Sequence, residues 1–363
     1  MKYKIDWDQH PVYLQLYHQI KEDIVNGTLG YHSKLPSKRL LALETKTSTV
    51  TVEHAYNLLC EEGYVESRER SGFFVIFQKG EVFFSEERKK VSPVLPTPPA
   101  HAYPEFPFSV LSKTMRNVLT VYGKETLERS PGQGRMELRS AIVGYLARNR
   151  GIYVTAEQIV VGSGAEYLYG LMIELLGRHR IYGIEVPSYE KIEQVYRASG
   201  VCLEFLALSC DGIDSAALAG AEANVLHTTP YRSFPSGITA SASKRHEYVH
   251  WAEQGDRYLI EDDFESEFSV LTKPQDTLFS LSPLDHVVYL NTFSRTISPS
   301  LRVGYMVLPP KLAHVFREKL GFYSCSVPTY EQLVLASLLD NGDFERHLNR
   351  VRRKLRKEMG ILK

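Results

Sequence analysis

Apolar side chains near the start of the chain repeat with the period of an α-helix. They fall at i, i+3, i+4, i+7 and i+11, a spacing that predicts one amphipathic helix ending near Gly27. Polar residues occupy the positions between them, so the opposite face of this helix is expected to meet solvent. The residues of the apolar face are Tyr13, Leu16, Tyr17, Ile20 and Ile24.

Two shorter helices and a hairpin are expected next. Ser37 and Ser48 can each cap a helix N-terminus, because a serine hydroxyl accepts one of the backbone N–H groups left free there. The order helix, helix, turn, helix and hairpin predicts a winged helix-turn-helix, whose third helix fits the major groove of DNA. The predicted helices are residues 38–44 and 49–61, and the predicted strands are 64–67 and 73–76.

This arrangement places hydroxyl and basic side chains where DNA would lie. The second helix and the start of the third would contact phosphates, outward residues of the third helix would face the bases, and the hairpin tip would reach the backbone or the minor groove. Residues 1–76 contain nine Lys/Arg and ten Asp/Glu, so charge alone leaves a dimerisation or protein-binding role open. The candidate DNA-binding residues are Lys38, Arg39, Ser48, Thr49, Thr51, His54, Arg68, Arg70 and Gly72.

The N-terminal region resembles the DNA-binding domain of the GntR family, which implies double-stranded DNA as a partner. Family members usually carry Arg-Asn after the serine that corresponds to Ser48, whereas this chain has Thr49 and Val50. The family's turn glycine is replaced by Lys46. Base readout by an arginine at position 49 is therefore absent. The resemblance rests on Pro11–Tyr17, Leu35–Ala42, Ala55–Tyr64 and Ser71–Val75.

A stretch rich in charged residues and proline follows, and it is expected to be an extended linker. Beyond it, strand-like and helical patterns alternate to the end of the chain, which predicts an α/β domain. The expected domains are a winged helix-turn-helix at 1–78, a linker at 79–104, and an α/β domain at 105–363 that ends in a long basic helix.

The α/β region resembles the fold-type I aminotransferases and, more narrowly, the MocR-type regulators that join such a domain to a GntR head. The expected fold is thus a winged helix-turn-helix (α+β) followed by an aminotransferase large domain. The small C-terminal domain of the family is expected to be missing, because the chain stops at Lys363. The matching stretches are Gly134–Ile152, Ile159–Tyr167, Glu185–Tyr189, Thr229–Gly237, Tyr258–Phe268 and Tyr289–Tyr305.

The same resemblance implies a cofactor-like pocket. In the family, a helix N-terminus after a glycine turn binds the phosphate of pyridoxal phosphate, a ring at Tyr189 stacks on the pyridine, and the residue at Asp262 pairs with the pyridine nitrogen. Ser294 and Arg302 match phosphate-binding positions. The candidate pocket residues are Gly164, Ala165, Glu166, Tyr189, Asp262, Ser294, Arg295 and Arg302.

One position decides the expected chemistry. The lysine that forms the Schiff base in the family falls on Arg295, and a family tyrosine near the ring falls on Phe264. A guanidinium stays protonated at neutral pH and cannot act as a nucleophilic amine. The sequence therefore predicts a protein that is not an enzyme and holds no covalent cofactor, with non-covalent binding of pyridoxal phosphate or another anion left open.

Composition adds few constraints. Lys+Arg and Asp+Glu both number 43, so the net charge is zero and says nothing of a nucleic-acid partner. The four cysteines lack zinc-site spacing, which predicts no metal. No signal peptide opens the chain, and no apolar run is long enough for a membrane span, so we expect a cytoplasmic protein. The aminotransferase resemblance implies a homodimer, and a small-molecule effector is left open.

Three functions are compatible with this sequence. The first is a DNA-binding regulator with a non-catalytic effector or dimerisation domain. The second is a pyridoxal-phosphate enzyme with an accessory domain, which would need another lysine, such as Lys244, to reach the pocket. The third is a ligand-free scaffold that only pairs two DNA-binding domains.

Overall fold

The computed structural model describes most of the 363 residues, and these form two compact units. One unit is built on the N-terminal helices and hairpin together with residues 240–247, and the other on a large mixed sheet. The linker predicted at 79–104 lies outside the described residues, and the domain boundaries remain predictions. The described residues are 3–7, 11–68, 71–77, 105–270, 275–282 and 286–359.

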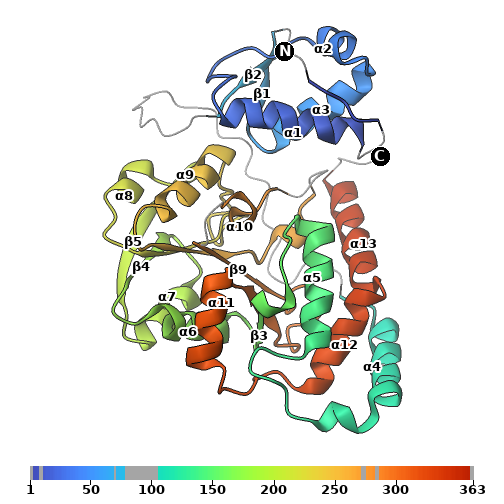
Figure 1. Ribbon diagram of the computed structural model, residues 1–363, viewed down its shortest axis with the longest axis vertical. Coiled ribbons are helices and arrows are strands. Elements are labelled where there is room, and N and C mark those ends of the chain that lie inside the picture. The colour runs from blue at the N-terminus through green and yellow to red at the C-terminus, as the bar shows by residue number, and fades with distance from the viewer. Residues whose placement is uncertain are drawn as a thin grey trace. The chain divides into compact units, whose positions relative to one another are not determined.

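The N-terminal unit has the predicted helices and hairpin (blue in Figure 1). The Ser37 hydroxyl accepts the Leu40 N–H at 3.2 Å, and the Ser48 hydroxyl accepts the Thr51 N–H at 3.0 Å, so both serines cap helices as predicted. The elements are α1 (Val12–Val25), α2 (Lys38–Thr45), α3 (Thr49–Glu61), β1 (Val65–Arg68) and β2 (Gly72–Val75).

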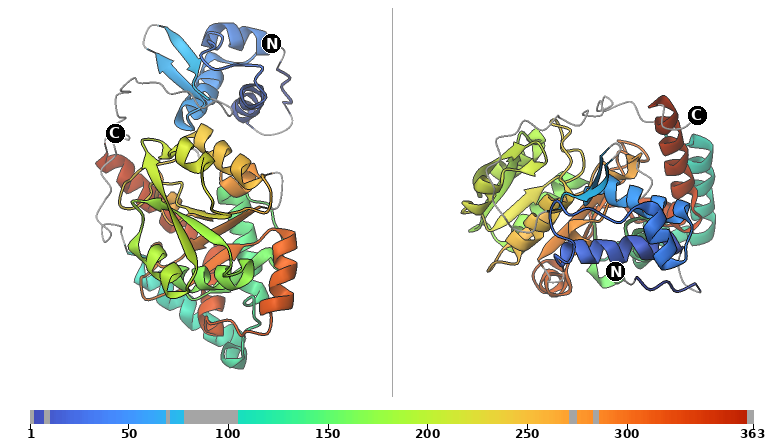
Figure 2. Two further views of the ribbon diagram at one scale, coloured as in Figure 1. Left: turned by 90° about the vertical axis from the view of Figure 1, so that its left-hand side faces the viewer. Right: turned by 90° about the horizontal axis from the view of Figure 1, so that it is seen from above.

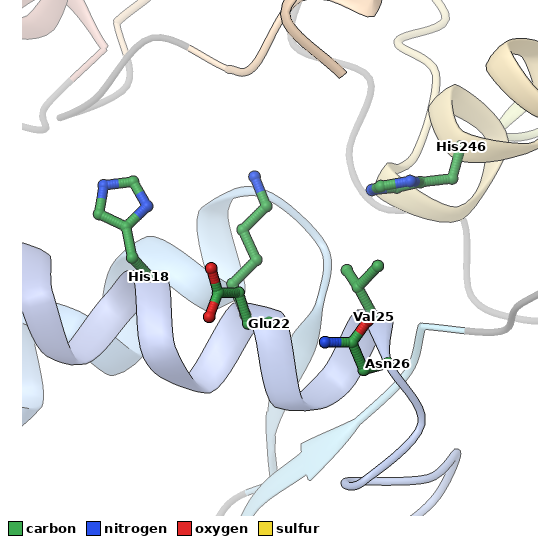
Figure 3. A pocket seen from close by; sticks show the side chains of 6 residues that line it. His18, Glu22, Val25, Asn26 and His246 are labelled. Atoms are coloured by element: carbon green, nitrogen blue, oxygen red, sulfur yellow. The ribbon is translucent and has the colours of Figure 1, made fainter. Parts of the chain in front are cut away.

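Helix α1 is amphipathic, as its sequence pattern predicts. Leu16 and Ile20 are almost fully buried in the core of the unit. The polar residues His18, Glu22 and Asn26 are exposed and follow one side of the helix (Figure 3). Because the apolar side packs on α3, burial in this small core fixes the direction in which α3 presents its own outer face.

The second unit is built on an eight-stranded sheet with the order β3-β10-β9-β8-β7-β4-β5-β6. Strands β5, β4, β7, β8 and β9 are parallel to one another, whereas β10 is antiparallel to both of its neighbours. The strands are β3 (Ile159–Gly162), β4 (Ile181–Val186), β5 (Cys202–Ser209), β6 (Gly212–Ile213), β7 (Val225–Thr228), β8 (Tyr258–Asp262), β9 (Val287–Thr292) and β10 (Gly304–Val307).

Helices cover both faces of this sheet, because alternate strand residues point to opposite sides and both sets are buried. In β10, Met306 packs in the core cluster formed with α6, α7 and α11, whereas Tyr305 packs in the cluster formed with α5 and α12. The helices are α4 (Phe108–Tyr122), α5 (Met136–Arg150), α6 (Ala165–Leu176), α7 (Glu190–Ala198), α8 (Ser215–Ala219), α9 (Ala242–Ala252), α10 (Leu278–Leu281), α11 (Pro310–Leu320), α12 (Thr329–Asp340) and α13 (Asp343–Glu358), with 3₁₀ turns η1 (Gly123–Leu127), η2 (Ala156–Gln158) and η3 (Ser266–Phe268).

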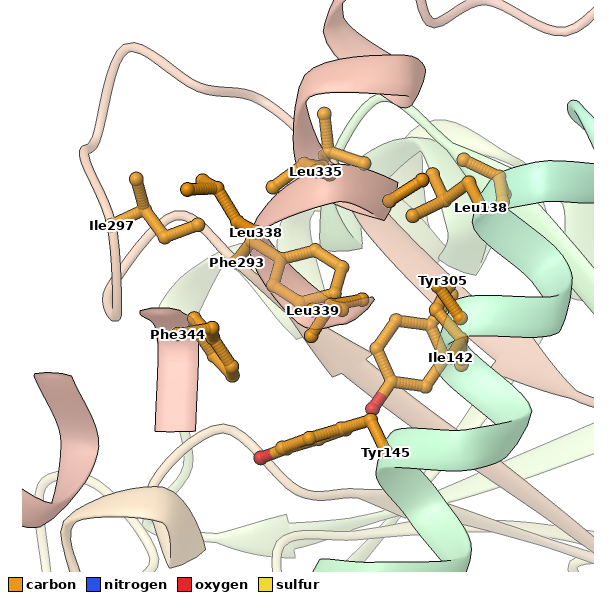
Figure 4. Close-up of a cluster of buried hydrophobic side chains, with 14 of the residues drawn as sticks. Leu138, Ile142, Tyr145, Phe293, Ile297, Tyr305, Leu335, Leu338, Leu339 and Phe344 are labelled. Atoms are coloured by element: carbon orange, nitrogen blue, oxygen red, sulfur yellow. The ribbon is translucent and has the colours of Figure 1, made fainter. Parts of the chain in front are cut away.

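The larger core lies between the sheet and α5, α12 and α13 (Figure 4). The Phe293 ring packs 5.5 Å from the Tyr305 ring and 5.6 Å from the Phe344 ring, measured between centroids. Helices α4 and α13 both pack against α12 (Figure 1 and Figure 2). Phe293 thus anchors the segment after β9, on which Ser294 and Arg295 lie. Among the described helices, none is long and apolar enough to cross a bilayer.

A buried acid cluster of Glu261, Asp263 and Glu267 lies at the end of β8. The guanidinium of Arg150 is 2.8 Å from the Asp263 carboxylate, and Asn291 donates a hydrogen bond of 2.6 Å to Glu267. Burial, followed by the charge of Asp263, raises the pKa of both Glu261 and Glu267 to about 7. Near neutral pH this cluster therefore carries less negative charge than three ordinary carboxylates would.

We expect Glu267→Gln to raise the stability of the second unit above that of the wild type at pH 8. A carboxyl group whose pKa is raised on folding holds its proton more tightly in the folded state, so its contribution falls as pH rises from about 4.5 to about 7. Glutamine loses no proton and keeps an oxygen for Asn291. The gain should be on the order of 1 kcal/mol, or roughly 2–4 °C in Tm, and should shrink at pH 5.

Thermal denaturation followed by circular dichroism at both pH values measures this difference. The exposed Glu190→Gln controls for the loss of one acidic side chain. If Glu267→Gln and the wild type changed stability equally between pH 5 and pH 8, Glu267 would not titrate in this window.

Candidate functional site

The first turn of α3 carries hydroxyl and apolar side chains and no charge. The hydroxyls of Ser48 and Thr51 are 2.8 Å apart, and Thr49 and Val50 are exposed. His54, one turn further along, is exposed. Its ring meets the Tyr13 ring edge-on, with the two ring centroids 5.8 Å apart. Free N–H groups at a helix N-terminus, together with these hydroxyls, suit a phosphate oxygen.

Three basic residues lie on α2 and on the turn that follows it. The Lys38 ammonium is 2.6 Å from the Glu53 carboxylate, and this ion pair joins α2 to α3 and lowers the pKa of Glu53. Arg39 and Lys46 are exposed. Lys46 has a φ of 55°, a left-handed conformation in which glycine is preferred, so it stands where the family's turn glycine was expected.

The hairpin carries two cations on one aromatic ring. The Arg68 guanidinium lies 4.6 Å from the centre of the Phe74 ring and pairs with Glu66 at 2.6 Å, and the Lys34 ammonium lies 5.8 Å from the same ring. Gly72 is opposite Arg68 and has a φ of 108°, and a Cβ there would meet the Lys34 side chain at 3.2 Å. Arg70 lies outside the described residues. Lys34 was not predicted from the sequence, because only the fold brings it to the hairpin.

In the second unit, the N-terminus of α6 faces a cationic side chain. Gly164 has a φ of 90°, and a Cβ there would come within 3.1 Å of the Arg302 guanidinium. Ala165 is the first residue of α6. Glu166 accepts hydrogen bonds from Arg302 and from Lys191, the latter at 2.8 Å. We call Glu166, Lys191 and Arg302 the Glu166 cluster.

The Glu166 cluster neutralises the cation predicted to bind phosphate. Burial alone would raise the pKa of Glu166, but the hydrogen bonds from Lys191 and Arg302 lower it below its ordinary value. The hydrogen bond to Glu166, followed by the charge of Tyr189, raises the pKa of Lys191. The Tyr189 ring is partly exposed and meets the Phe234 ring edge-on, with the two ring centroids 6.2 Å apart. An anion that binds Arg302 must therefore compete with a carboxylate of the chain itself.

Asp262 is buried on the opposite side of β8 from the buried acid cluster. One of its oxygens, Oδ2, accepts a hydrogen bond from the Tyr169 hydroxyl and lies 3.4 Å from His227 Nε2. The Tyr196 hydroxyl is 2.7 Å from His227 Nδ1, so a proton on Nε2 lets His227 accept from Tyr196 and donate to Asp262. The other oxygen, Oδ1, is buried and has no hydrogen-bond partner in the described part of the chain.

This arrangement suits a ligand that donates a hydrogen bond. Burial and the nearby Asp262 carboxylate raise the pKa of Tyr169 far above its ordinary value, so its hydroxyl keeps its proton and remains a donor. A buried acceptor without a partner costs roughly 1–3 kcal/mol. A ring N–H at Oδ1 would remove that cost.

Arg295 forms an ion pair with Glu265, whose side chain is only 3% exposed. The Arg295 guanidinium also lies over the Phe264 ring, 5.4 Å from its centre, so it packs against the segment that directly follows Asp262. Arg232 approaches the same Glu265 at 4.0 Å. The Ser294 hydroxyl donates to the Leu301 carbonyl at 3.1 Å and so bridges its own loop. The position predicted for the Schiff-base lysine is thus occupied by a charge-paired guanidinium.

The structure brings some of the predicted pocket residues together and separates others. Glu166 joins Gly164 and Arg302, and Arg295 joins the segment after Asp262. Tyr189 contacts Phe234. Lys244, considered above as an alternative catalytic amine, pairs instead with Glu247 on its own helix at 3.0 Å. Sequence reasoning gave no role to five residues of this site: Tyr169, Lys191, Tyr196, His227 and Glu265.

Two families match the chain. Residues 12–75 match the gntR family of bacterial regulatory proteins, which covers the winged helix-turn-helix. Residues 105–362 match the class I and II aminotransferases, which covers the mixed sheet and its helices.

Curated relatives combine both parts. The uncharacterized HTH-type transcriptional regulator YdeL of Bacillus subtilis is 32% identical over 97% of this chain and 78% of its own length. The HTH-type pyridoxine biosynthesis transcriptional regulator PdxR of Corynebacterium glutamicum is 30% identical over 96% of this chain and 77% of its own. The probable rhizopine catabolism regulatory protein MocR of Rhizobium meliloti is 27% identical over 94% and 74%.

Solved structures support the fold of the second unit. An archaeal alanine:glyoxylate aminotransferase superposes with a TM-score of 0.62 at 22% identity, over 69% of this chain and 65% of that one. The kynurenine aminotransferase of Pyrococcus horikoshii superposes with a TM-score of 0.62 at 23% identity, over 70% and 67%. With both family matches and the relatives that share them, the chain belongs to the MocR-type transcription regulators, in which a gntR-family DNA-binding domain is joined to an aminotransferase-like domain.

Proposed function

We propose that this DNA-binding regulator contacts its operator through the start of α3 and the hairpin, and that its aminotransferase-like domain senses an anionic small molecule without catalysis. The observation that carries the second part is Arg295, which stands at the lysine position and is paired with the buried Glu265. A regulator of chromosomal genes acts in the cytoplasm, and we place this protein there.

The DNA-binding face combines neutral and cationic contacts. Ser48 and Thr51 offer hydroxyls beside the free N–H groups of the α3 N-terminus. Arg39 and Lys46 add positive charge, and neither forms an ion pair within the described residues. Lys38, in contrast, is paired with Glu53. Arg68 and the glycine turn of the hairpin provide the second contact. These features support phosphate binding on both sides of the α3 first turn.

The second unit lacks the means for the family's chemistry. A guanidinium remains protonated and forms no covalent bond with an aldehyde at neutral pH. The ion pair with Glu265 also keeps Arg295 from acting as a mobile base. We therefore infer that the domain was retained for binding and not for transamination.

The remaining residues fit a pyridine phosphate held without a covalent bond. Asp262 Oδ1 would accept the ring N–H, and Arg302 with the α6 N-terminus would hold the phosphate. When bound in an enzyme, pyridoxal phosphate supplies an electron-withdrawing ring. Here Asp262 would orient the ring. Glu166 would compete with the phosphate for Arg302 until the phosphate displaced it.

We propose that the protein is a homodimer that joins through the second unit. Large apolar side chains are exposed on α4, on η1 and on the loop before α12. This loop lies against the segment after η1, because a Cβ on Gly132 would meet the Tyr323 carbonyl oxygen at 2.6 Å. Apolar surface of this kind is usually buried against a partner. The exposed residues are Phe108, Leu119, Val121, Leu127, Phe322 and Tyr323.

Removal of Arg39 or Lys46 should weaken binding to all duplexes alike. Each lost phosphate contact should reduce the slope of log K against log salt by about 1, because one counterion fewer is released. Electrophoretic mobility shifts at several salt concentrations with Arg39→Ala and Lys46→Ala measure this slope. Lys113→Ala on α4 removes the same charge from the second unit and should leave the slope unchanged. An equal decrease of this slope in all three variants would show that α2 and its turn are not part of the DNA-binding face.

The wild type should form no covalent lysine adduct with pyridoxal phosphate, whereas Arg295→Lys should form one. The variant supplies an amine at the family's position, and Glu265 remains beside it as a charge partner. A visible absorbance titration followed by borohydride trapping and peptide mass spectrometry measures the adduct. A trapped lysine in the wild type would refute the non-catalytic assignment, and an absence of adduct in both proteins would refute the pyridine-phosphate pocket.

Glu166→Gln should tighten the binding of pyridoxal phosphate about fivefold. The change releases Arg302 and Lys191 from an internal carboxylate, and an ion pair of this exposure contributes at most about 1 kcal/mol. Isothermal titration calorimetry measures the affinity. Glu174→Gln lies on the same helix, breaks a pair with Arg178 and should have no effect. If Glu166→Gln bound no more tightly than Glu174→Gln, the carboxylate would not compete with the ligand.

A further inference from the structure

Val50 is an apolar side chain exposed at the second position of α3. Its side chain is 57% exposed, while Val52, two residues on, is completely buried in the core of the unit. Thr49 beside it is exposed as well. Val50 is therefore not one of the core residues that hold α3 in place.

Helix stability does not explain a valine there either. A β-branched side chain loses rotamer freedom in a helix, and an exposed valine is less favourable than alanine or a long polar residue. The first turn of a recognition helix is the part that reaches base edges. Its place in that turn, and not its exposure alone, makes Val50 a candidate for a contact with a base.

The surroundings of Val50 limit which base it can read. The α3 first turn has no guanidinium or ammonium that could pair with guanine, and the one carboxylate nearby, Glu53, is held by Lys38 at 2.6 Å. Hydroxyls at Ser48 and Thr51 are turned toward each other. Among the four bases, thymine alone presents a methyl group in the major groove, and apolar side chains recognise it by contact.

We propose that Val50 reads the C5 methyl of a thymine in each operator half-site. This inference rests on the DNA-binding face of α3 proposed above and adds to it the base that the face prefers. The specificity then comes from the burial of methyl groups, while Arg39 and Lys46 supply affinity without sequence preference.

The test begins with selection of bound duplexes from a random pool by the full-length protein. In the enriched duplex, each thymine is then replaced singly by deoxyuridine, which removes the methyl and nothing else. The wild type should lose about fourfold in affinity at one thymine per half-site, the value of about one buried methyl group. Val50→Ala should bind the thymine and deoxyuridine duplexes equally at that position.

Leu43→Ala is the matched control, because Leu43 is an exposed apolar residue of α2 in the same unit. It should keep the full fourfold loss. A Val50→Ala protein that retained the deoxyuridine loss with unchanged affinity would show that Val50 does not contact the methyl, and it would overturn the inference while leaving the proposed face intact. Equal weakening on both duplexes would keep the face and overturn the methyl contact. A pool without an enriched sequence would overturn it too.

Discussion

Much of the second unit depends on how charge is buried at the end of β8. Successive residues of a strand point to opposite faces, so Glu261 and Asp263 meet the α5 side while Asp262 meets the α6 side. On one side, Arg150 offsets part of the negative charge, and on the other Tyr169 and His227 share one carboxylate oxygen. Buried charges persist only when paired or hydrogen-bonded, so each side needs its own set of partners. Asp262 Oδ1 is left without a hydrogen-bond partner among the described residues, and the proposed ligand would bind there.

Internal ion pairs neutralise both arginines of the proposed pocket. Glu166 pairs with Arg302, which would face a phosphate, and Glu265 pairs with Arg295, which lies at the position predicted for the lysine. Both pairs join segments distant in sequence, so they close the site while they hold α6 and the loop after β9 in place. Under the proposed function, a ligand would exchange partners with these ion pairs instead of filling an empty site. That exchange would move side chains, and a signal to another part of the protein requires a movement of this kind.

Much of this was predictable from the sequence, and the remainder depended on tertiary contacts. The helices of the N-terminal unit followed from apolar periodicity, and Ser37 and Ser48 from the chemistry of helix caps. The resemblance indicated Asp262 and Arg295, because both lie in continuous motifs. Lys34 and His227 could not be predicted, because each reaches its site only through strand pairing. Lys34 pairs with Phe74 of the hairpin, and His227 lies on β7, which pairs with β8. Lys191 was missed for the same reason, because its partner Glu166 lies on another helix.

Lys46 has a further consequence for the response of the protein to heat. A non-glycine residue in the left-handed region costs roughly 1 kcal/mol, and the N-terminal unit is small, with a core that can supply only a few kcal/mol of net stability. The second unit has a far larger core on both faces of its sheet. We therefore expect the N-terminal unit to unfold at a lower temperature than the second unit.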